Sequence, residues 1–226
     1  MMDTSQIVLD AIASRKSVRG FLPKAVDIGL VKKILGAASY APSGSNIQPW
    51  KVHVVTGAKR DELSRALVDA HNQKRPETRE YEYYPVAWRS PYIERRRETG
   101  WGLYGTLGIQ KGDREASQQQ HAQNYLFFQA PVVFIFTIDN DLEKGSWLDY
   151  GMFLQNIMVA ARGCGLHTCP QAALANYPDI VKSLLGIGDD QVVVCGMSMG
   201  YEDTNCLANQ FRTGRIALSE FVTFCE

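Results

Sequence analysis

Apolar side chains recur at helical spacing in several stretches of the chain, and this pattern predicts its helices. Residues 4–14 place a set of apolar side chains on one helical face: Ile7, Val8, Ala11 and Ile12. A second helix is predicted to begin at Asp27, a favourable N-cap, and to end before Pro42, which cannot continue it. Similar spacing predicts helices over residues 59–72, 113–129, 146–163 and 179–185, with Asp113 as the N-cap of the second and Gly186 at the end of the last. The segment 146–163 is apolar on nearly every face, which is typical of a helix buried in a core or a subunit interface.

Apolar and β-branched runs predict about four strands, over residues 50–56, 131–139, 166–169 and 191–199. The tail, residues 216–225, also has strand-like apolar content. Helices and strands alternate along the chain, so we expect an α+β, or mixed α/β layered, fold rather than a barrel. With 226 residues and no internal repeat, the chain is expected to form a single domain over residues 1–226, with a C-terminal extension at about 204–226.

Residues 75–111 differ from the rest of the chain. They contain Pro76, Pro85 and Pro91 together with many aromatic residues, and they show little clean periodicity. This composition predicts an irregular insertion with short helices, and such a segment is the expected place for a lid over a substrate site.

Composition excludes several functional classes. Lysine and arginine total 24, as do aspartate and glutamate, so no overall field attracts the protein to nucleic acid or anionic lipid. The chain has no run of 18 apolar residues and no signal-peptide core, so we expect no membrane partner and a cytoplasmic location. The arginine-rich stretch 89–98 is interpreted as a solvated lid helix rather than a nucleic-acid contact, because two glutamates offset its four arginines.

The sequence indicates neither a metal site nor a nucleophilic side chain. Its five cysteines form no CxxC pair, and the odd number argues against a disulfide scaffold. Cys164, His167 and Cys169 fit no common zinc spacing and are interpreted as core or strand positions. No GxSxG, Walker A or strand-linked GxGxxG motif is present, so a Rossmann site for nicotinamide is not supported.

Three polar motifs remain, and each has an ordinary alternative explanation. Residues 15–19 (RKSVR) suit a phosphate, although cations are also typical of a solvated helix C-terminus. Residues 41–50 (APSGSNIQPW) can direct backbone and amide groups at a planar heterocycle, or they form a plain helix-to-strand turn. Residues 212–215 (RTGR) are cationic beside a glycine, as surface turns often are.

Taken together, these motifs resemble the FMN-dependent nitroreductase family. The similar segments are RKSVRGF, APSGSNIQPW, AARGCGL followed by PQAAL, and CGMSMGY before FRTGR, and they extend over nearly the whole chain. LYGTLGIQKGDREA and NYLFFQAPVV are similar to segments of nitroaromatic and nitrobenzoate reductases. The resemblance implies a nitroreductase-like fold, with a central, mostly antiparallel sheet flanked by helices, in an intertwined homodimer. It also implies ping-pong electron transfer from NAD(P)H through FMN to a nitroaromatic or quinone-like acceptor.

The resemblance also implies which residues contact FMN. The ribityl-phosphate is assigned to Arg15, Lys16 and Ser17, with the C-terminal cations Arg212 and Arg215. Arg19 is assigned to the pyrimidine edge of the flavin, and either Gln123 or Asn124 to a further polar contact. The loop that reaches FMN across the dimer interface corresponds to Pro42, Ser43, Gly44 and Asn46. The segment beside the isoalloxazine corresponds to Pro170, Gln171, Ala172 and Ala173, with the Ala172 backbone N–H expected near flavin N5.

The chain departs from the family at this last segment, because many members carry Pro-x-Glu-Gly there. A backbone N–H can still serve N5, but the substrate preference beside it stays open. No catalytic side chain is expected, because the cofactor carries the chemistry. The alternatives are another reaction on the same scaffold (reductive dehalogenation, flavin destruction or dehydrogenation) or an FMN-binding protein without turnover.

The lid predicts a small, planar, aromatic substrate. Its candidate stacking faces are Tyr81, Tyr83, Tyr84, Trp88, Tyr92, Trp101 and Tyr104. Its candidate partners for a carboxylate are Arg89, Arg95, Arg96 and Arg97. This set suits a nitroarene or quinone, with a preference for acids, although the same aromatic rings can equally fill the core of the lid.

Overall fold

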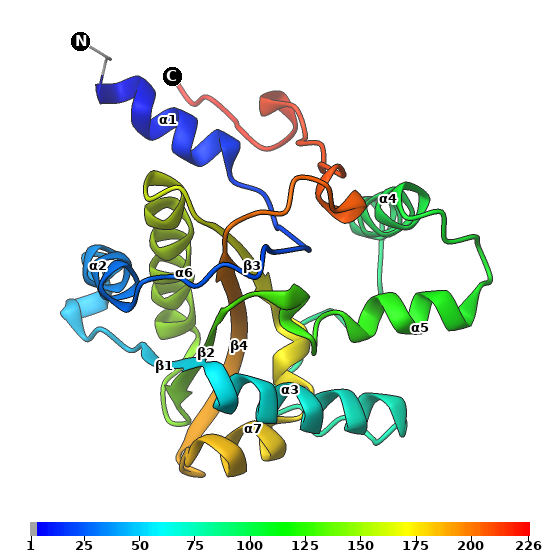
Figure 1. Ribbon diagram of the computed structural model, residues 1–226. Coiled ribbons are helices and arrows are strands. Elements are labelled where there is room, and N and C mark those ends of the chain that lie inside the picture. The colour runs from blue at the N-terminus through cyan, green and yellow to red at the C-terminus, as the bar shows by residue number, and fades with distance from the viewer. Residues whose placement is uncertain (1–3) are drawn as a thin grey trace.

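The computed structural model describes residues 4–226, and a four-stranded antiparallel sheet lies at its centre (Figure 1). The strands are β1 (Lys51–Thr56), β2 (Val132–Asp139), β3 (His167–Gln171) and β4 (Gln191–Gly200), in the spatial order β1-β2-β4-β3. The two central strands, β2 and β4, are buried along most of their length, which explains their continuous apolar sequence.

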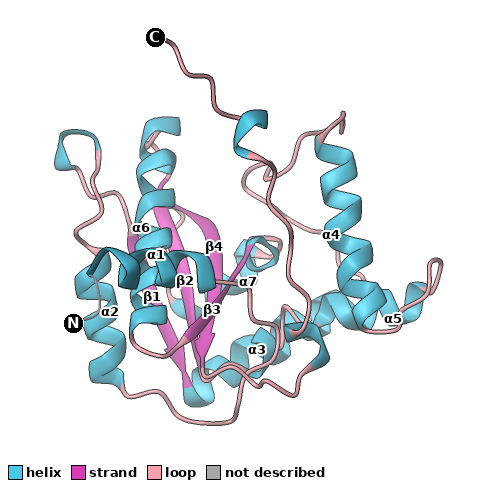
Figure 2. Ribbon diagram, turned by 90° about the horizontal axis from the view of Figure 1, so that it is seen from above, coloured by secondary structure: helices cyan, strands magenta, loops and turns pink. Residues whose placement is uncertain are grey.

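Helices cover both faces of this sheet. In the described part of the chain they are α1 (Thr4–Ser14), α2 (Ile28–Ala38), α3 (Gly57–Asn72), α4 (Tyr92–Thr106), α5 (Arg114–Ala122), α6 (Lys144–Gly163) and α7 (Pro178–Leu185). Helices α2 and α6 lie on one face of the sheet, and α3 and α7 on the other (Figure 2). Phe134 and Phe136 of β2 pack in the core with α2 and α6, whereas Val133 and Ile135 pack in the second core with α3 and α7. Alternate residues of one strand therefore serve two cores, and the predicted α+β layered fold is confirmed.

Several predicted helix boundaries are confirmed by their caps. The Asp27 carboxylate accepts a hydrogen bond of 2.9 Å from the Leu30 N–H, and Asp113 does the same for Ala116. Gly186 ends α7 in the left-handed conformation, with φ of 66°.

Three sequence-based predictions of local structure are wrong. The helix predicted over 113–129 stops at Ala122, and residues 127–129 then have φ of 54°, 52° and 67°, a conformation that no right-handed helix contains. The tail over 216–225 forms no strand, only a short 3₁₀ turn at Leu218–Glu220. The segment 75–111 holds α4, a helix of 15 residues, where only short helices were expected.

Of the two settings predicted for helix α6, a core and a subunit interface, the chain itself supplies the first. Tyr150, Phe153 and Ile157 pack in the core shared with α2. Leu148 lies on the other side and is 72% exposed. The chain therefore leaves part of the apolar surface of this helix uncovered.

The two ends of the chain meet over the β3 edge of the sheet. The Val18 N–H donates to the Thr168 carbonyl at 3.1 Å, and Phe21 forms an isolated bridge with Glu202. The segment that follows β4 therefore lies beside residues 15–21, and α4 stands next to it at the side of the molecule (Figure 1).

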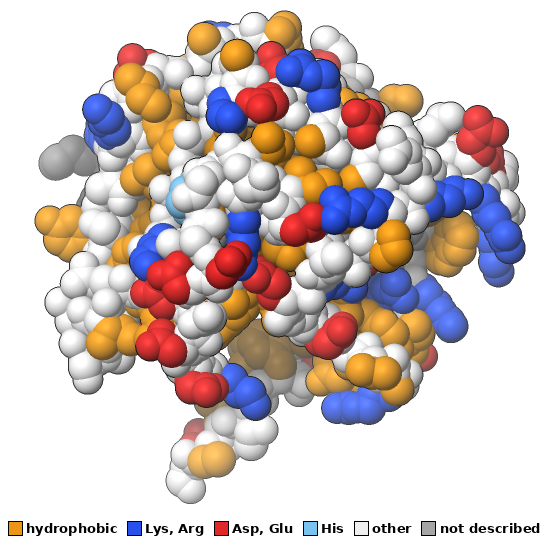
Figure 3. All heavy atoms as spheres, turned by 90° about the horizontal axis from the view of Figure 1, so that it is seen from below, with side chains coloured by type: hydrophobic (Ala, Val, Ile, Leu, Met, Phe, Trp, Pro, Cys, Tyr) orange, Lys and Arg blue, Asp and Glu red, His pale blue; other side chains and the backbone are white. Residues whose placement is uncertain are grey.

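The surface on the face shown in Figure 3 mixes basic and acidic side chains, in agreement with the formal net charge of zero. None of the helices within residues 4–226 is long and apolar enough to cross a membrane. In the same residues, no group of three or more His, Cys, Asp or Glu side chains could hold a metal ion.

Candidate functional site

A cavity rich in arginine forms where the two ends of the chain meet. This cationic cavity has a volume of about 190 Å³. Its polar lining consists of Arg15, Lys16, Ser17, Arg19, Arg212, Thr213 and Arg215. Two motifs that lie about 200 residues apart in the sequence therefore form one site, as their joint assignment to a phosphate requires.

The guanidinium groups of this cavity are close enough to repel one another. Burial, and after it the charge of Arg215, lowers the pKa of Arg15, and Arg212 acts in the same direction. Arg212 is fixed by donating to the Ala13 carbonyl at 2.9 Å, and Arg215 by donating to the Thr213 hydroxyl at 2.8 Å. No Asp or Glu belongs to the lining. Such a cluster favours an anion, because an anion removes the repulsion between the cations.

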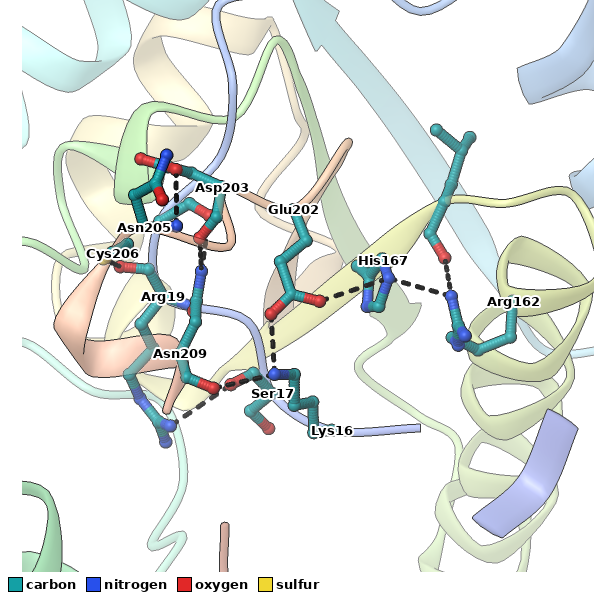
Figure 4. A network of polar contacts seen from close by, with 12 residues as sticks. Lys16, Ser17, Arg19, Arg162, His167, Glu202, Asp203, Asn205, Cys206 and Asn209 are labelled. Atoms are coloured by element: carbon teal, nitrogen blue, oxygen red, sulfur yellow. Dashed lines mark hydrogen bonds and ion pairs between the residues drawn. The ribbon is translucent and has the colours of Figure 1, made fainter. Parts of the chain in front are cut away.

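Lys16 differs from these arginines because a carboxylate already neutralises it (Figure 4). Its Nζ lies 2.6 Å from Glu202 Oε1 and donates to the Asn209 carbonyl at 2.7 Å. The other oxygen of Glu202 lies 3.3 Å from His167 Nε2, and Arg162 Nη1 lies 2.9 Å from the same nitrogen. Burial and the Arg162 charge lower the pKa of His167. Lys16 therefore supplies the cavity with less free positive charge than Arg15 does.

Asn209 joins the two segments that form the cationic cavity. Its side-chain oxygen accepts from the Arg19 N–H at 2.6 Å, and its Nδ2 donates to the carbonyls of Gly20 and Asp203, each at 2.8 Å (Figure 4). The residue is almost fully buried. Sequence reasoning missed Asn209 and Glu202, because a single amide or carboxylate in an irregular tail forms no recognisable pattern.

A second cavity, of about 260 Å³, lies at the other end of β3. This β3 cavity is lined by Pro170, Gln171, Ala172 and Ala173, opposite the side chains Arg79, Tyr81, Tyr83, Tyr84, His121 and Asn124. Ala172 begins the short 3₁₀ helix η3 (Ala172–Ala175), so its N–H has no acceptor within that helix. The segment assigned to the flavin ring therefore presents backbone groups to a cavity.

The Gln171 side chain is buried, and both ends of its amide are bonded within the protein. Its Nε2 donates to the Asn124 carbonyl at 2.8 Å, and its Oε1 accepts from the Ser198 hydroxyl at 2.6 Å. Of the two alternatives for a further polar contact, Asn124 lines the cavity and Gln123 does not. Arg79 and His121 were not predicted from sequence, because neither belongs to a motif.

Strand β3 connects the two cavities. Thr168 bridges to Ser17 beside the cationic cavity, and Pro170 and Gln171 line the β3 cavity. Cys169 lies between them: burial raises its pKa to about 11, against opposing effects from Arg19, Ser17 and Arg15. A single extended ligand could thus follow one strand from a cationic end to a backbone-lined end.

The loop containing Pro42, Ser43, Gly44 and Asn46 lines neither cavity of its own chain. It lies beside α2, on the side of the sheet away from α4 (Figure 1). The Gly44 N–H donates to Asp149 Oδ2 at 3.0 Å, and Asn46 adopts a φ of 56°. The loop is therefore ordered by its own chain but remains mostly exposed.

The lid forms a third cavity, of about 650 Å³, against α4. This lid cavity is lined by the aromatic residues Tyr84, Trp88, Tyr92, Trp101 and Tyr104 and by Arg95, Arg96 and Arg97. Tyr84 is its one lining residue shared with the β3 cavity. Tyr81 instead packs edge-on against Trp147 and donates to the Val194 carbonyl, and Arg89 covers the Tyr92 ring at 4.9 Å.

The chain is similar to known nitroreductases in sequence and in fold. The sequence profile of the nitroreductase family matches residues 12–201. The chain is 42% identical to a 4-nitrobenzoate reductase of Pseudomonas putida over 94% of its length and 93% of the relative's. It is 41% identical to a nitrobenzene nitroreductase of Ectopseudomonas oleovorans over 99% of both chains. Its fold matches the FMN-dependent nitroreductase NfnB from Mycobacterium smegmatis, solved in complex with NADPH, with a TM-score of 0.95, 35% identity and coverage of 99% and 100%.

Proposed function

This chain belongs to the nitroreductase family, and we propose that it uses bound FMN to carry electrons from NAD(P)H to a nitroaromatic or quinone-like acceptor. The relatives named above are nitrobenzoate and nitrobenzene reductases, and one solved relative is FMN-dependent and binds NADPH. The protein is accordingly an FMN-dependent NAD(P)H oxidoreductase. The observation that carries this conclusion is the convergence of Arg15, Arg212 and Arg215 on a cavity without a carboxylate, at one end of β3.

The residues of the cationic cavity fit the phosphate of FMN. A phosphate dianion would offset the mutual repulsion of Arg15, Arg212 and Arg215, and guanidinium groups match its oxygens in pairs. The Ser17 hydroxyl can donate to the same group, and Arg19 is the cation assigned to the pyrimidine edge. Lys16 is proposed to act mainly through Glu202 and Asn209, by holding the two segments of the cavity together.

The residues of the β3 cavity fit the reactive part of the flavin ring. When bound, FMN supplies two-electron transfer at N5. The Ala172 N–H is proposed to donate toward N5, with Pro170 and Ala173 beside it, while the aromatic lid excludes water from the opposite side. Gln171 positions this segment from within the core, since both ends of its amide are bonded there.

We propose that the active protein is an intertwined homodimer. Helix α1 exposes a row of apolar side chains: Ile7, Val8, Leu9 and Ile12. Tyr40 is 89% exposed, and Leu148 of α6 is also uncovered. A partner subunit would cover these surfaces and would bring the loop 42–46 to the flavin of its neighbour, since that loop lines neither the cationic cavity nor the β3 cavity of its own chain. Interfaces of this kind bury more than about 2,000 Å². Sedimentation showing a folded, flavin-loaded monomer at micromolar concentration would contradict the dimer.

The single domain over residues 1–226, with a lid at about 75–111 and an extension at about 204–226, remains a proposal. The packing of Phe211 against Gly102 of α4 supports it, because a Cβ on Gly102 would lie 2.4 Å from the Phe211 ring. A cytoplasmic location is also proposed, because the reductant is an intracellular metabolite.

For the acceptor, the β3 cavity favours one aromatic ring, with only a modest preference for acids. Its one arginine is Arg79, whose Nη2 lies 2.5 Å from Glu77 Oε2, so its charge is largely offset. A partly exposed ion pair contributes at most about 1 kcal/mol, so we expect kcat/KM for 4-nitrobenzoate to exceed that for nitrobenzene by no more than about fivefold. The lid arginines Arg95, Arg96 and Arg97, which were predicted from sequence to bind a substrate carboxylate, line a separate cavity.

The absorption spectrum of the purified protein, followed by anaerobic titration with NADH and NADPH and a steady-state assay with 4-nitrobenzoate, tests the proposed function. We expect a flavin spectrum, bleaching by a nicotinamide and turnover of the nitroarene. A colourless protein that takes up no FMN would refute the proposal. FMN binding without bleaching would indicate a flavin-binding protein, and bleaching without turnover of the nitroarene would indicate another reaction on the scaffold.

A further inference from the structure

The lid cavity is larger than one substrate ring needs, and it is adjacent to the site proposed for the reaction. Its volume is about 650 Å³, against about 260 Å³ for the β3 cavity. Tyr84 lines both. A nitroarene beside Ala172 would occupy the β3 cavity alone. A ligand that fills both the β3 cavity and the lid cavity must be long. It must also carry a different group at each end, because the two linings differ.

The lid cavity has the charge of an anion site. Arg95, Arg96 and Arg97 line it, and its lining contains no Asp or Glu. Two glutamates of the same helix, Glu94 and Glu98, lie outside this lining. Three guanidinium groups are more than a single carboxylate requires, whereas a phosphate monoester carries close to two charges and offers three acceptor oxygens.

Arg96 is the central cation of this set. Tyr92, Arg96 and Gly100 follow one another at four-residue spacing and therefore lie along one face of α4. A Cβ added to Gly100 would meet open space, so the glycine leaves room in front of Arg96. The Arg96 guanidinium lies 4.9 Å from the centre of the Trp88 ring, which orients it without neutralising it. Arg95 is less available, because its Nη2 lies 3.5 Å from Glu220 Oε2.

The same cavity offers aromatic surface to a planar base. Trp101 is 44% exposed, and its ring meets Tyr104 edge-on at a centroid distance of 6.0 Å. Because Trp101 is partly exposed, its indole can stack against a planar ligand. Lys111 lies 6.0 Å from the same ring and adds a further positive charge. A base and a phosphate can therefore be held side by side on α4.

We propose that the lid cavity binds the adenosine 2′-phosphate end of NADPH, with Arg96 and Arg97 on the phosphate and Trp101 stacked on the adenine. The inference rests on the proposed function, because it places the nicotinamide end against the flavin ring bound at the β3 cavity, across Tyr84. A dinucleotide has the length and the two distinct ends that the pair of cavities requires. The lid thereby makes the enzyme prefer NADPH to NADH, which lacks the 2′-phosphate.

Direct binding of nucleotide fragments to the FMN-loaded protein tests this site without any turnover. By calorimetry, 2′,5′-ADP should bind at least about tenfold more tightly than 5′-AMP, because one charge-assisted contact accounts for that factor. Arg96→Ala and Arg97→Ala should each reduce the difference between the two nucleotides to about threefold or less. Trp101→Leu should weaken both nucleotides by a similar factor. Arg65→Ala, an exposed arginine of α3, is the matched control and should change neither.

Steady-state kinetics separate the failure of this inference from the failure of the proposed function. We expect kcat/KM for NADPH to exceed that for NADH by about tenfold, and Arg96→Ala to remove most of that ratio. If the enzyme oxidises both nicotinamides with equal efficiency, or if 2′,5′-ADP binds no better than 5′-AMP, the assignment of the lid cavity is wrong while the flavin function stands. If neither nicotinamide reduces the bound flavin, the proposed function itself fails.

Discussion

Replacing Arg15 with methionine tests the arginine cluster of the cationic cavity. Methionine keeps an unbranched apolar side chain of similar length but removes the charge and the N–H donors. In the native protein the Arg15 guanidinium is partly buried beside Arg215 and Arg212, and both burial and these neighbours lower its pKa. The substitution therefore removes a phosphate ligand from the FMN complex, and from the apoprotein it removes one member of a group of like charges.

The substitution should weaken FMN binding but should not destabilise the apoprotein. A hydrogen bond to a charged group contributes about 1.5–3 kcal/mol, so FMN should bind about 10- to 150-fold more weakly. The free energy of unfolding of the apoprotein should stay the same or rise, because a group whose pKa is lowered in the folded state is less favourably charged there than in the unfolded chain. Riboflavin, which has no phosphate, should lose much less affinity than FMN.

Fluorescence titration of the apoprotein with FMN and with riboflavin measures both affinities, and urea denaturation measures stability. Arg65→Met in α3 is the control for loss of an exposed arginine. An FMN Kd within threefold of the wild-type value would refute the role of Arg15. An equal loss for FMN and riboflavin, together with a destabilised apoprotein, would show that Arg15 acts through packing rather than through the phosphate.

Three further predictions concern the frame of the site. Burial lowers the pKa of His53 and of His167. Below pH about 6.5 the unfolded chain binds more protons than the native state, so stability should fall as the pH falls toward the lowered values, by at most ~1.4 kcal/mol per pH unit for each histidine. Denaturation at pH 7.5 and 5.5 checks this, and His53→Gln should flatten the dependence. Gly196→Ala would place a Cβ 2.2 Å from Leu174 of η3, so it should cost about 1–3 kcal/mol and lower kcat; an unchanged melting temperature would contradict this. Gln171→Leu should cost about 2–3 kcal/mol in urea denaturation, because it leaves buried polar partners without a hydrogen bond, and a stable variant would contradict the role given to its amide.

The sequence predicts the helices and strands well wherever local chemistry determines them. Asp27 and Asp113 cap their helices as expected, and the buried strands are evident from their continuous apolar runs. The prediction fails at residues 127–129, because three successive residues with positive φ depend on tertiary packing. It also fails in the tail, because apolar content makes a strand only when a neighbouring strand accepts its hydrogen bonds, and the chain supplies no such neighbour there.

The site is predictable in its motifs but not in its supporting residues. The motifs 15–19 and 212–215 each have an ordinary explanation alone, and only their joint resemblance to a family indicated a shared cavity, which the structure contains. The same reasoning gave Lys16 a direct role on the phosphate and could not detect that Glu202 neutralises it. Arg79 was missed for a related reason, because a single arginine in an irregular segment carries no signal until folding brings it opposite Ala172.

These observations explain why the proposed cofactor site depends on the whole chain. The cationic cavity needs residues from both ends of the sequence, and Asn209 fastens one end to the other through hydrogen bonds with Lys16, Arg19 and Gly20. The β3 cavity needs η3, which Gly196 of β4 allows to pack closely on the sheet. Strand β3 lies between the two cavities, because Thr168 pairs with Ser17 of the cationic cavity and Pro170 and Gln171 line the β3 cavity. A ligand that spans the two cavities would therefore link residues 15–19 and 212–215 to the segment 170–173, and its binding energy would stabilise the packing of these segments.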